Sequence, residues 1–185
     1  MVDTHFYVPT SQRQRLVAVY ASDTLNHVSR APEGARGQGH YVDGPRRSFA
    51  GGAGIVSTAR DYARFLQMLL NGGLLDGKRL LGPKTVAYMT ADHLSPAIAT
   101  TPLYLPGPGF GFGLGFAVRR DAGVSPVAGT VGEYNWGGAG GTYFWVDPRE
   151  DLFVVFMMQS PKQRVPYRAV LKDMIYAAIT RSAVK

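Results

Sequence analysis

The chain has 185 residues, 45% of them hydrophobic and 11% aromatic, which is enough apolar material for one domain with its own core. It has no cysteine, which excludes disulfides, thiol nucleophiles and thiolate metal sites. No run reaches the roughly 18 apolar residues of a membrane span, and the first residues lack the charged and apolar regions of a signal peptide. We expect a soluble chain, cytoplasmic or periplasmic, whose compartment the sequence leaves unknown.

The net charge of +7 comes from 20 basic and 13 acidic residues, which are interleaved along the chain. A nucleic-acid surface would show a clustered basic face or a recognisable module, and neither is visible. No two of the four histidines have the spacing of a metal-binding helix. We therefore predict no nucleic-acid partner, no metal and no cofactor.

Residues 1–50 are irregular and rich in turn signals, which predicts a segment that wraps around the domain. Residues 51–108 are predicted to hold helices and a cleft loop. Thr58 can cap the first helix, with Asp61 three residues later, and Asn71-Gly72-Gly73 supplies a left-handed stop. Between them, one apolar face repeats at helical spacing: Tyr62, Phe65, Leu66, Leu69 and Leu70.

A shorter helix is predicted from Gly82-Pro83 to about Met89, because proline is favoured at the first helical position. A long proline-rich loop follows from Asp92 to Pro108. Loops of this length are uncommon unless they are functional or mobile. The loop is therefore a candidate rim for a binding cleft, with a plain surface excursion as the alternative.

Residues 109–185 are predicted to form strands and a terminal helix. Glycines alternate with bulky residues over 109–116, which predicts one strand with a bare face open to a helix or a substrate. Further strands are predicted at about 139–146 and 152–158, joined by a turn of hairpin length. The helix runs from about 166 to 181 with an apolar stripe at Val170, Leu171, Met174, Ile175, Ala178 and Ile179. Three antiparallel strands covered by a terminal helix indicate an α+β fold.

The segment 132–148 is the most informative part of the chain, because glycine fills four of the five positions from 137 to 141. Each of these glycines would weaken an ordinary strand. A backbone this bare favours the close approach of a ligand. The alternatives are a bulge or a tight contact between a helix and the strand.

Three segments, residues 51–66, 111–116 and 134–138, resemble the C-terminal half of serine hydrolases with the β-lactamase and penicillin-binding-protein fold. Trp136-Gly137-Gly138 is similar to the motif of class C β-lactamase-like enzymes and family VIII carboxylesterases in which Trp-Gly-Gly replaces Lys-Thr-Gly. The resemblance covers essentially the whole chain. It implies an antiparallel sheet with flanking helices, in a fold that lacks its N-terminal half.

The resemblance also implies hydrolysis through an acyl-enzyme on an active-site serine. Trp136, Gly137 and Gly138 then correspond to the third motif, and the Ala139 N–H to an oxyanion donor, a contact worth roughly 3 to 4 kcal/mol. Tryptophan in place of lysine removes the cation that would hold a β-lactam carboxylate, which favours small-molecule esters or amides over β-lactams. Glu133 and Tyr134 are candidates for the pocket wall, with packing or surface roles as the alternative.

The resemblance also implies residues that this chain lacks. No Tyr-x-Asn occurs, and the Ser-x-x-Lys at Ser182 to Lys185 lies at the extreme C-terminus, where chains fray. We regard that match as accidental and expect the nucleophile and base outside this chain, which would be inactive alone. Met1 would then be internal to a longer parent, and an exposed sheet edge would pair with the missing N-terminal half or with itself.

Two other functions remain possible at this point. A non-catalytic binding or assembly module on the same fold would bind acyl compounds without turnover. A basic nucleic-acid binder would show a salt-dependent affinity for DNA or RNA.

Overall fold

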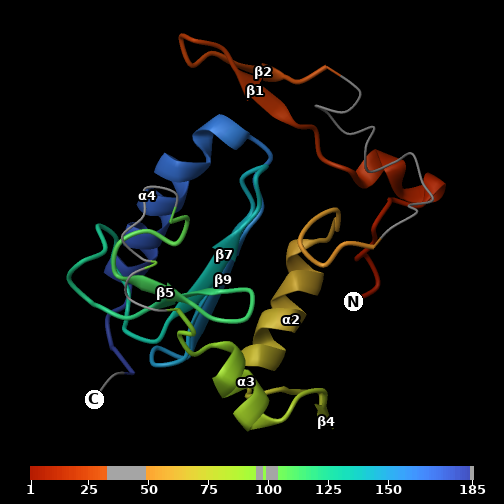
Figure 1. The fold of residues 1–185 in the computed structure, drawn as a ribbon. Coiled ribbons are helices and arrows are strands. Elements are labelled where there is room, and N and C mark those ends of the chain that lie inside the picture. Colours follow the sequence, from red (N-terminus) through yellow and green to blue (C-terminus); the bar gives the residue numbers. More distant parts are fainter. Residues whose placement is uncertain (33–48, 95–97, 99–103, 184–185) are drawn as a thin grey trace.

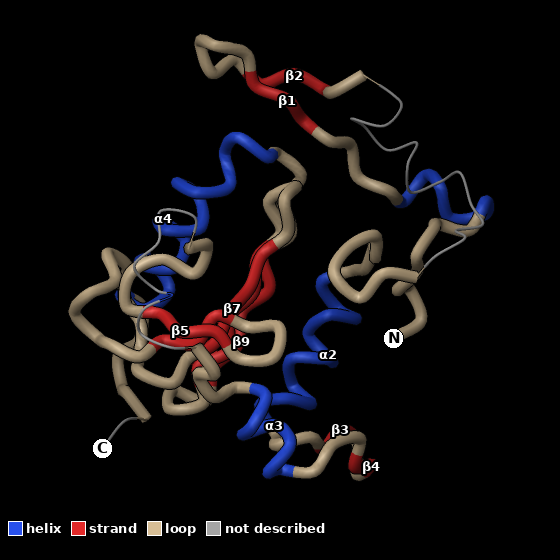
Figure 2. Tube along the Cα trace, in the orientation of Figure 1, coloured by secondary structure: helices blue, strands red, loops and turns tan. Residues whose placement is uncertain are grey.

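The computed structural model describes residues 1–32, 49–94, 98 and 104–183. Its centre is a five-stranded antiparallel sheet in which the strands lie in chain order. The sheet is sandwiched between helix α2 on one side and helix α4 on the other (Figures 1 and 2). The strands are β5 (Phe110–Phe112), β6 (Ala117–Arg119), β7 (Tyr134–Gly137), β8 (Tyr143–Asp147) and β9 (Leu152–Phe156).

The sheet has two more strands than predicted, because the expected strand over 109–116 is wrong. β5 ends at Phe112, the chain turns, and β6 returns beside it with Phe110 opposite Arg119. Gly115 takes a φ of 95° in this turn, a conformation that favours glycine. Glycine continues to alternate with bulky residues through this turn. The alternation therefore could not show that the strand ends and a second one begins. β7 was also missed, and β8 begins only at Tyr143.

The bare side of β5 faces the segment that follows α3 (Pro83–Met89). A Cβ on Gly113 would collide with the Met89 carbonyl oxygen, and one on Gly111 with the Asp92 carboxylate. This carboxylate accepts the Phe112 N–H at 3.0 Å. The bare face therefore admits the end of a helix. Of the predicted cleft loop, residues 95–97 and 99–103 lie outside the described residues.

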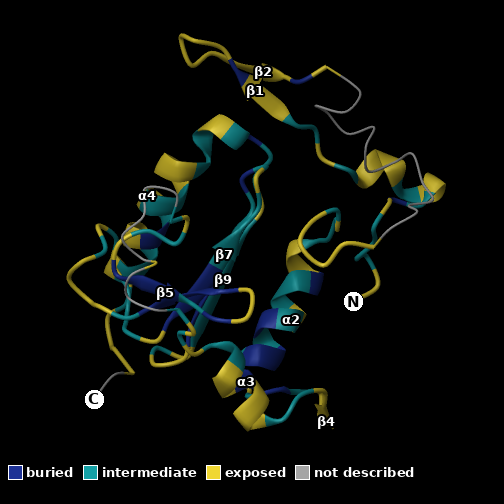
Figure 3. Cartoon of the chain, viewed as in Figure 1, coloured by how far each residue is buried: buried dark blue, intermediate teal, exposed yellow. Residues whose placement is uncertain are grey.

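Helix α2 (Ala59–Leu70) formed where the sequence predicted it. The Thr58 hydroxyl accepts the Asp61 N–H at 3.2 Å. Gly73 closes the helix with a φ of 94° and donates to the Met68 carbonyl. Its apolar face packs on the sheet and builds the core, the dark blue zone of Figure 3, whose most buried members are Leu66, Met68, Leu69, Val86, Phe116, Val118, Tyr134, Phe144 and Val146.

Helix α4 (Arg164–Ala177) lies near its predicted position, but the expected apolar stripe is not the side that it buries. Val170 and Met174 are exposed, whereas Lys172 is only 1% exposed. The sheet beneath α4 holds buried acidic side chains, which attract the long cationic side chains of the helix. The exposed apolar side of α4 consists of Tyr167, Val170 and Met174.

The N-terminal segment connects the two sides of the molecule. It contains a 3-10 helix, η1 (Thr10–Arg15), and a hairpin of β1 (Tyr20–Ser22) and β2 (Val28–Arg30). The Asp3 N–H donates to the Asp61 carboxylate at 2.7 Å, beside the start of α2. The Tyr20 N–H donates to the Gln159 carbonyl at 2.8 Å, just before η3 (Pro161–Gln163) and α4.

A small hairpin of β3 (Leu74–Leu75) and β4 (Lys78–Arg79) follows α2. Within the described ranges, no helix has the length and apolar character needed to cross a bilayer.

Candidate active site

Strand β7 has an edge that is only half covered. On one side all four of its residues pair with β8. On the other side β6 pairs only with Tyr134 and Asn135. The outer edge at Trp136 and Gly137 therefore faces no other strand of the described chain. An open strand edge offers backbone groups to a ligand.

Ala139 lies just beyond this edge, in the turn that joins β7 to β8. It is exposed, and among the described residues its N–H donates no hydrogen bond. Two nearby amides are occupied: Gly138 N–H donates to the Thr142 carbonyl at 2.9 Å and Gly141 N–H to the Gly138 carbonyl at 3.2 Å. Within the described turn, the N–H groups of Ala139 and Gly140 donate no hydrogen bond, and Ala139 is the more exposed of these two residues. Such a group can stabilise a developing oxyanion.

Trp136 is half-buried on the α2 side of β7. Its ring meets the Phe112 ring edge-on, with centroids 5.0 Å apart, and it packs against the core. Trp136 itself belongs to the open edge of β7, so the exposed part of its indole lies at that edge. The site therefore offers an apolar surface beside a neutral hydrogen-bond donor.

The glycines of the third motif have contacts inside the protein. A Cβ on Gly137 would lie 2.6 Å from the Arg168 guanidinium of α4, and one on Gly138 would collide with the Thr142 hydroxyl. Gly140 and Gly141 face Gln159 and Met158, at 2.5 and 2.7 Å from the position of a Cβ. The tight contact between a helix and the strand therefore explains Gly137 without a ligand.

Tyr134 and Glu133 are both buried in the interior. Tyr134 is 1% exposed and packs against Phe116 with ring centroids 5.2 Å apart. Glu133 is 0% exposed. These positions fit the packing alternative, because Tyr134 points into the core below α2 and Glu133 lies beneath α4.

Glu133 is the centre of a buried charge cluster between the sheet and α4. Its carboxylate accepts from Arg119 Nε at 2.9 Å and from Lys172 Nζ. The Tyr176 hydroxyl bridges the two carboxylates, at 2.8 Å from Glu133 and 2.7 Å from Asp147. Arg119, Glu133, Asp147 and Lys172 are each at most 1% exposed. Sequence analysis missed this cluster, because its members are scattered over more than 50 positions.

The buried tyrosines predict a loss of stability in alkali. Burial raises the pKa of Tyr134, Tyr143 and Tyr176 above the ordinary value of 10.0. Unfolded tyrosines release their protons near that pH while the folded ones retain them, so the stabilisation is complete below about pH 10 and is lost as the pH rises further. We expect the free energy of unfolding, measured in urea, to fall by about 1.4 kcal/mol per pH unit for Tyr134.

Tyr134→Phe isolates this effect, because the Tyr134 hydroxyl is buried without a partner among the described residues. We expect the variant to be as stable as the parent at neutral pH, or more stable, and to lose less stability in alkali. The exposed Tyr88 gives the control variant Tyr88→Phe. Equal alkaline slopes for both variants would contradict the interpretation.

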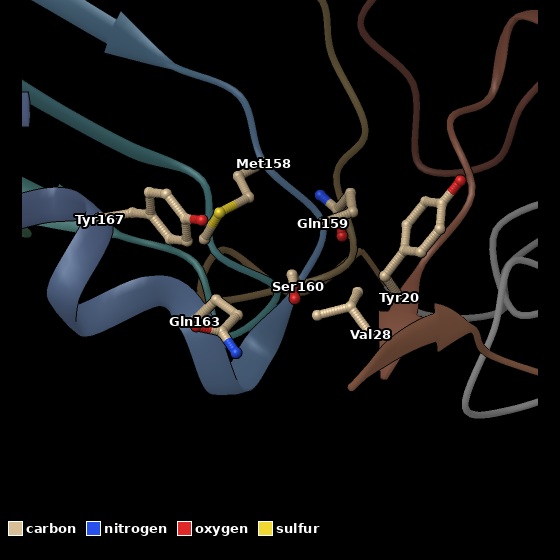
Figure 4. A pocket seen from close by; sticks show the side chains of 7 residues that line it. All are labelled: Tyr20, Val28, Met158, Gln159, Ser160, Gln163 and Tyr167. Carbon is tan, nitrogen blue, oxygen red and sulfur yellow. The ribbon is translucent and has the colours of Figure 1, made fainter. Parts of the chain in front are cut away.

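A pocket of about 250 Å³ lies behind the glycine turn. Tyr20 and Val28 of the N-terminal hairpin face the segment from Met158 to Gln163 across it, and Tyr167 of α4 closes one side (Figure 4). None of the seven lining side chains is charged. Ser160 is 9% exposed, and its hydroxyl has no partner among the described residues. Because Met158 and Gln159 also face Gly141 and Gly140, the pocket adjoins the turn that holds Ala139.

Ser182 lies far along the chain from this turn, near the C-terminus. Its hydroxyl donates to Glu150 Oε1 at 2.6 Å, and Lys185 lies outside the described residues. That the Ser-x-x-Lys match is accidental stays a prediction.

Comparisons with known proteins agree on one family. A family model described as Beta-lactamase matches residues 1–175. Protein Rv1367c of Mycobacterium tuberculosis is 36% identical over 170 residues, which are 86% of this chain and 40% of that protein. A putative D-alanyl-D-alanine carboxypeptidase of Salmonella paratyphi B is 32% identical over 119 residues, 63% of this chain and 24% of that protein.

Solved structures show the same relation. EstCE1, described as a hydrolase with promiscuous acyltransferase activity, superposes with a TM-score of 0.73 at 27% identity, over 94% of this chain and 46% of EstCE1. A penicillin-binding-protein homologue of Caulobacter crescentus gives 0.64 at 20% identity, over 96% of this chain and 48% of that one, and supports the fold alone. The chain thus spans less than half the length of these relatives. It belongs to the beta-lactamase family and has part of that family's antiparallel sheet with flanking helices.

Proposed function

We propose that this chain supplies the oxyanion-binding strand of a serine hydrolase that cleaves ester or amide bonds through an acyl-enzyme. The observation that carries the proposal is the N–H of the exposed residue Ala139, which has no acceptor in the described part of the chain and lies just beyond the open end of β7. It stands immediately after Trp136-Gly137-Gly138, the residues that resemble the family's third motif. A ligand carbonyl lying against this edge would place its oxygen on the donor.

The surroundings favour a neutral substrate. Trp136 presents an apolar ring where a lysine would attract a carboxylate. The pocket behind the turn offers two glutamine amides, a serine hydroxyl and apolar surface, and no charged side chain. These features fit a small-molecule ester with apolar parts better than an anionic β-lactam. The likeness to EstCE1, described as a hydrolase, supports hydrolysis as the reaction class.

The serine and its base are proposed to come from the half of the fold that this chain does not contain. The sheet ends at β9, whose outer edge faces no other strand of the described residues. The exposed apolar side of α4 is available to a second polypeptide as well. The division into a wrapping segment (1–50), helices with a cleft loop (51–108) and strands with a terminal helix (109–185) stays part of this proposal.

The test is hydrolysis of a short-chain p-nitrophenyl ester, first by the chain alone and then by the chain co-expressed with the N-terminal half of a family member. We expect no turnover and no label from an active-serine probe for the chain alone, and both for the purified complex of the two halves. Ser182→Ala in the complex is expected to leave the rate unchanged.

Two results would count against the proposal. Turnover by the isolated chain, with the label on one of its own serines, would show that the nucleophile lies within it. A stable complex that binds esters without turnover would favour the non-catalytic module, for which the uncharged pocket is the supporting observation.

A further inference from the structure

Arg168 of α4 reaches across to the turn that holds the proposed oxyanion donor. One of its terminal nitrogens, Nη2, donates to the Gly138 carbonyl at 2.7 Å and to the Thr142 carbonyl at 2.6 Å. Its guanidinium lies over the Tyr143 ring, 5.0 Å from the centroid. It also fills the space beside Gly137 where any other residue would place a Cβ. The side chain is therefore fixed by contacts on several sides.

The Gly138 carbonyl and the Ala139 N–H belong to the same peptide group. In a trans peptide these two groups point in opposite directions. A cation held on the carbonyl oxygen from the side of α4 therefore directs the N–H away from α4. The carbonyl also accepts from the Gly141 N–H at 3.2 Å, so both of its acceptor positions are used and the peptide plane cannot rotate freely.

The charge has a second effect. A positive group on the carbonyl oxygen polarises the peptide and makes its N–H a stronger donor, as in cooperative hydrogen-bond chains. Charge-assisted bonds to arginine are also shorter and stronger than neutral ones. Burial lowers the pKa of Arg168, but arginine stays protonated at neutral pH because its ordinary pKa is so high.

We infer that Arg168 is a positioning residue for the oxyanion donor: it fixes and polarises the Gly138–Ala139 peptide so that the Ala139 N–H is presented to the substrate oxygen. The inference rests on the proposed function. Arg168 touches no reacting atom and acts only through the peptide. Arg164 supports the next peptide in the same way, with Nη1 at 3.3 Å from the Ala139 carbonyl.

The first experiment needs no catalysis. The full chain is labelled with ¹³C and ¹⁵N, and Arg168→Met is compared with the parent and with Arg149→Met. Arg149 is exposed on the turn between β8 and β9, so its variant removes one positive charge without touching the glycine turn. We expect Arg168→Met to move the Gly138 carbonyl ¹³C signal and to lower the ¹H–¹⁵N nuclear Overhauser effect of Ala139. Arg149→Met is expected to change neither.

Unchanged Gly138 and Ala139 signals in a folded Arg168→Met would overturn the inference. If that variant does not fold, Arg168→Gln provides the same readout, because it keeps an amide donor but has no charge. We expect a change in the same direction, and unchanged signals would again overturn the inference.

The second experiment uses the active complex of the two halves. We expect Arg168→Met to lower kcat about tenfold, less than the loss of a donor itself, with KM within about twofold of the parent. A kcat equal to that of Arg149→Met would overturn the catalytic role. A parent complex without activity would instead contradict the proposed function, while the labelled-chain experiment would still decide the role of Arg168.

Discussion

Replacing Ala139 with proline is expected to lower kcat of the two-half enzyme by about 100- to 1,000-fold, the usual cost of losing one oxyanion donor. Proline has no N–H, so the variant deletes the proposed donor itself. Ala139 is exposed, and no side chain of the core is disturbed. The effect is expected in kcat and in kcat/KM alike, because the oxygen becomes charged only in the transition state.

The matched control is Ala139→Ser, which adds a small polar side chain but retains the N–H. We expect its kcat within a few fold of the parent. Because proline also restricts the backbone, both variants are compared by thermal unfolding and by formation of the complex. A folded Ala139→Pro complex that retains most of its activity would mean that another group binds the oxyanion.

Glu133→Gln is expected to lower the free energy of unfolding by about 3 to 5 kcal/mol, as measured by urea denaturation of the isolated chain. Among the described residues, the amide removes the one carboxylate that both Arg119 and Lys172 contact. Both cations are almost fully buried, so they would remain in the interior without the carboxylate that pairs with them directly. This is the largest loss of stability that we expect from an isosteric change in this chain.

Lys172→Met provides the comparison. It removes one buried cation and leaves Glu133 paired with Arg119, so we expect a smaller loss than for Glu133→Gln. The double variant with Lys172→Met and Glu133→Gln is expected to be less destabilised than the sum of the single changes, because the groups interact directly. A loss below about 1 kcal/mol for Glu133→Gln would show that water reaches the cluster.

Helix α2 was predictable because its signals are local. Thr58, the apolar repeat and Gly73 all lie within 16 residues, and each acts on its own neighbourhood. Helix α4 was predictable in position but not in orientation. Its apolar repeat fits a helix, but the buried side is chosen by Glu133 and Asp147 on distant strands, which attract Lys172 and Tyr176.

The candidate site also has residues that were predictable from the sequence and residues that were not. Resemblance to a family was enough to single out Trp136 to Ala139, since these residues are consecutive. The sequence left two roles open for Tyr134, pocket wall or packing, because the burial of this side chain depends on the distant Phe116 and on α2. Arg168 gave no signal in the sequence, because the carbonyl that it contacts is 30 positions away. The resemblance singled out the proposed donor peptide, whereas its contact with Arg168 is visible only in the folded chain.

The order of the strands in the sheet has a consequence for folding. Each strand from β5 to β9 pairs with the strand before it, so most of the sheet forms by closing short loops. Pairing between strands that are neighbours in sequence costs less loop-closure entropy than pairing between distant strands. No further strand has to be inserted between neighbouring strands of this sheet. The five strands can therefore form their sheet before any further strand is added at the edge of β9.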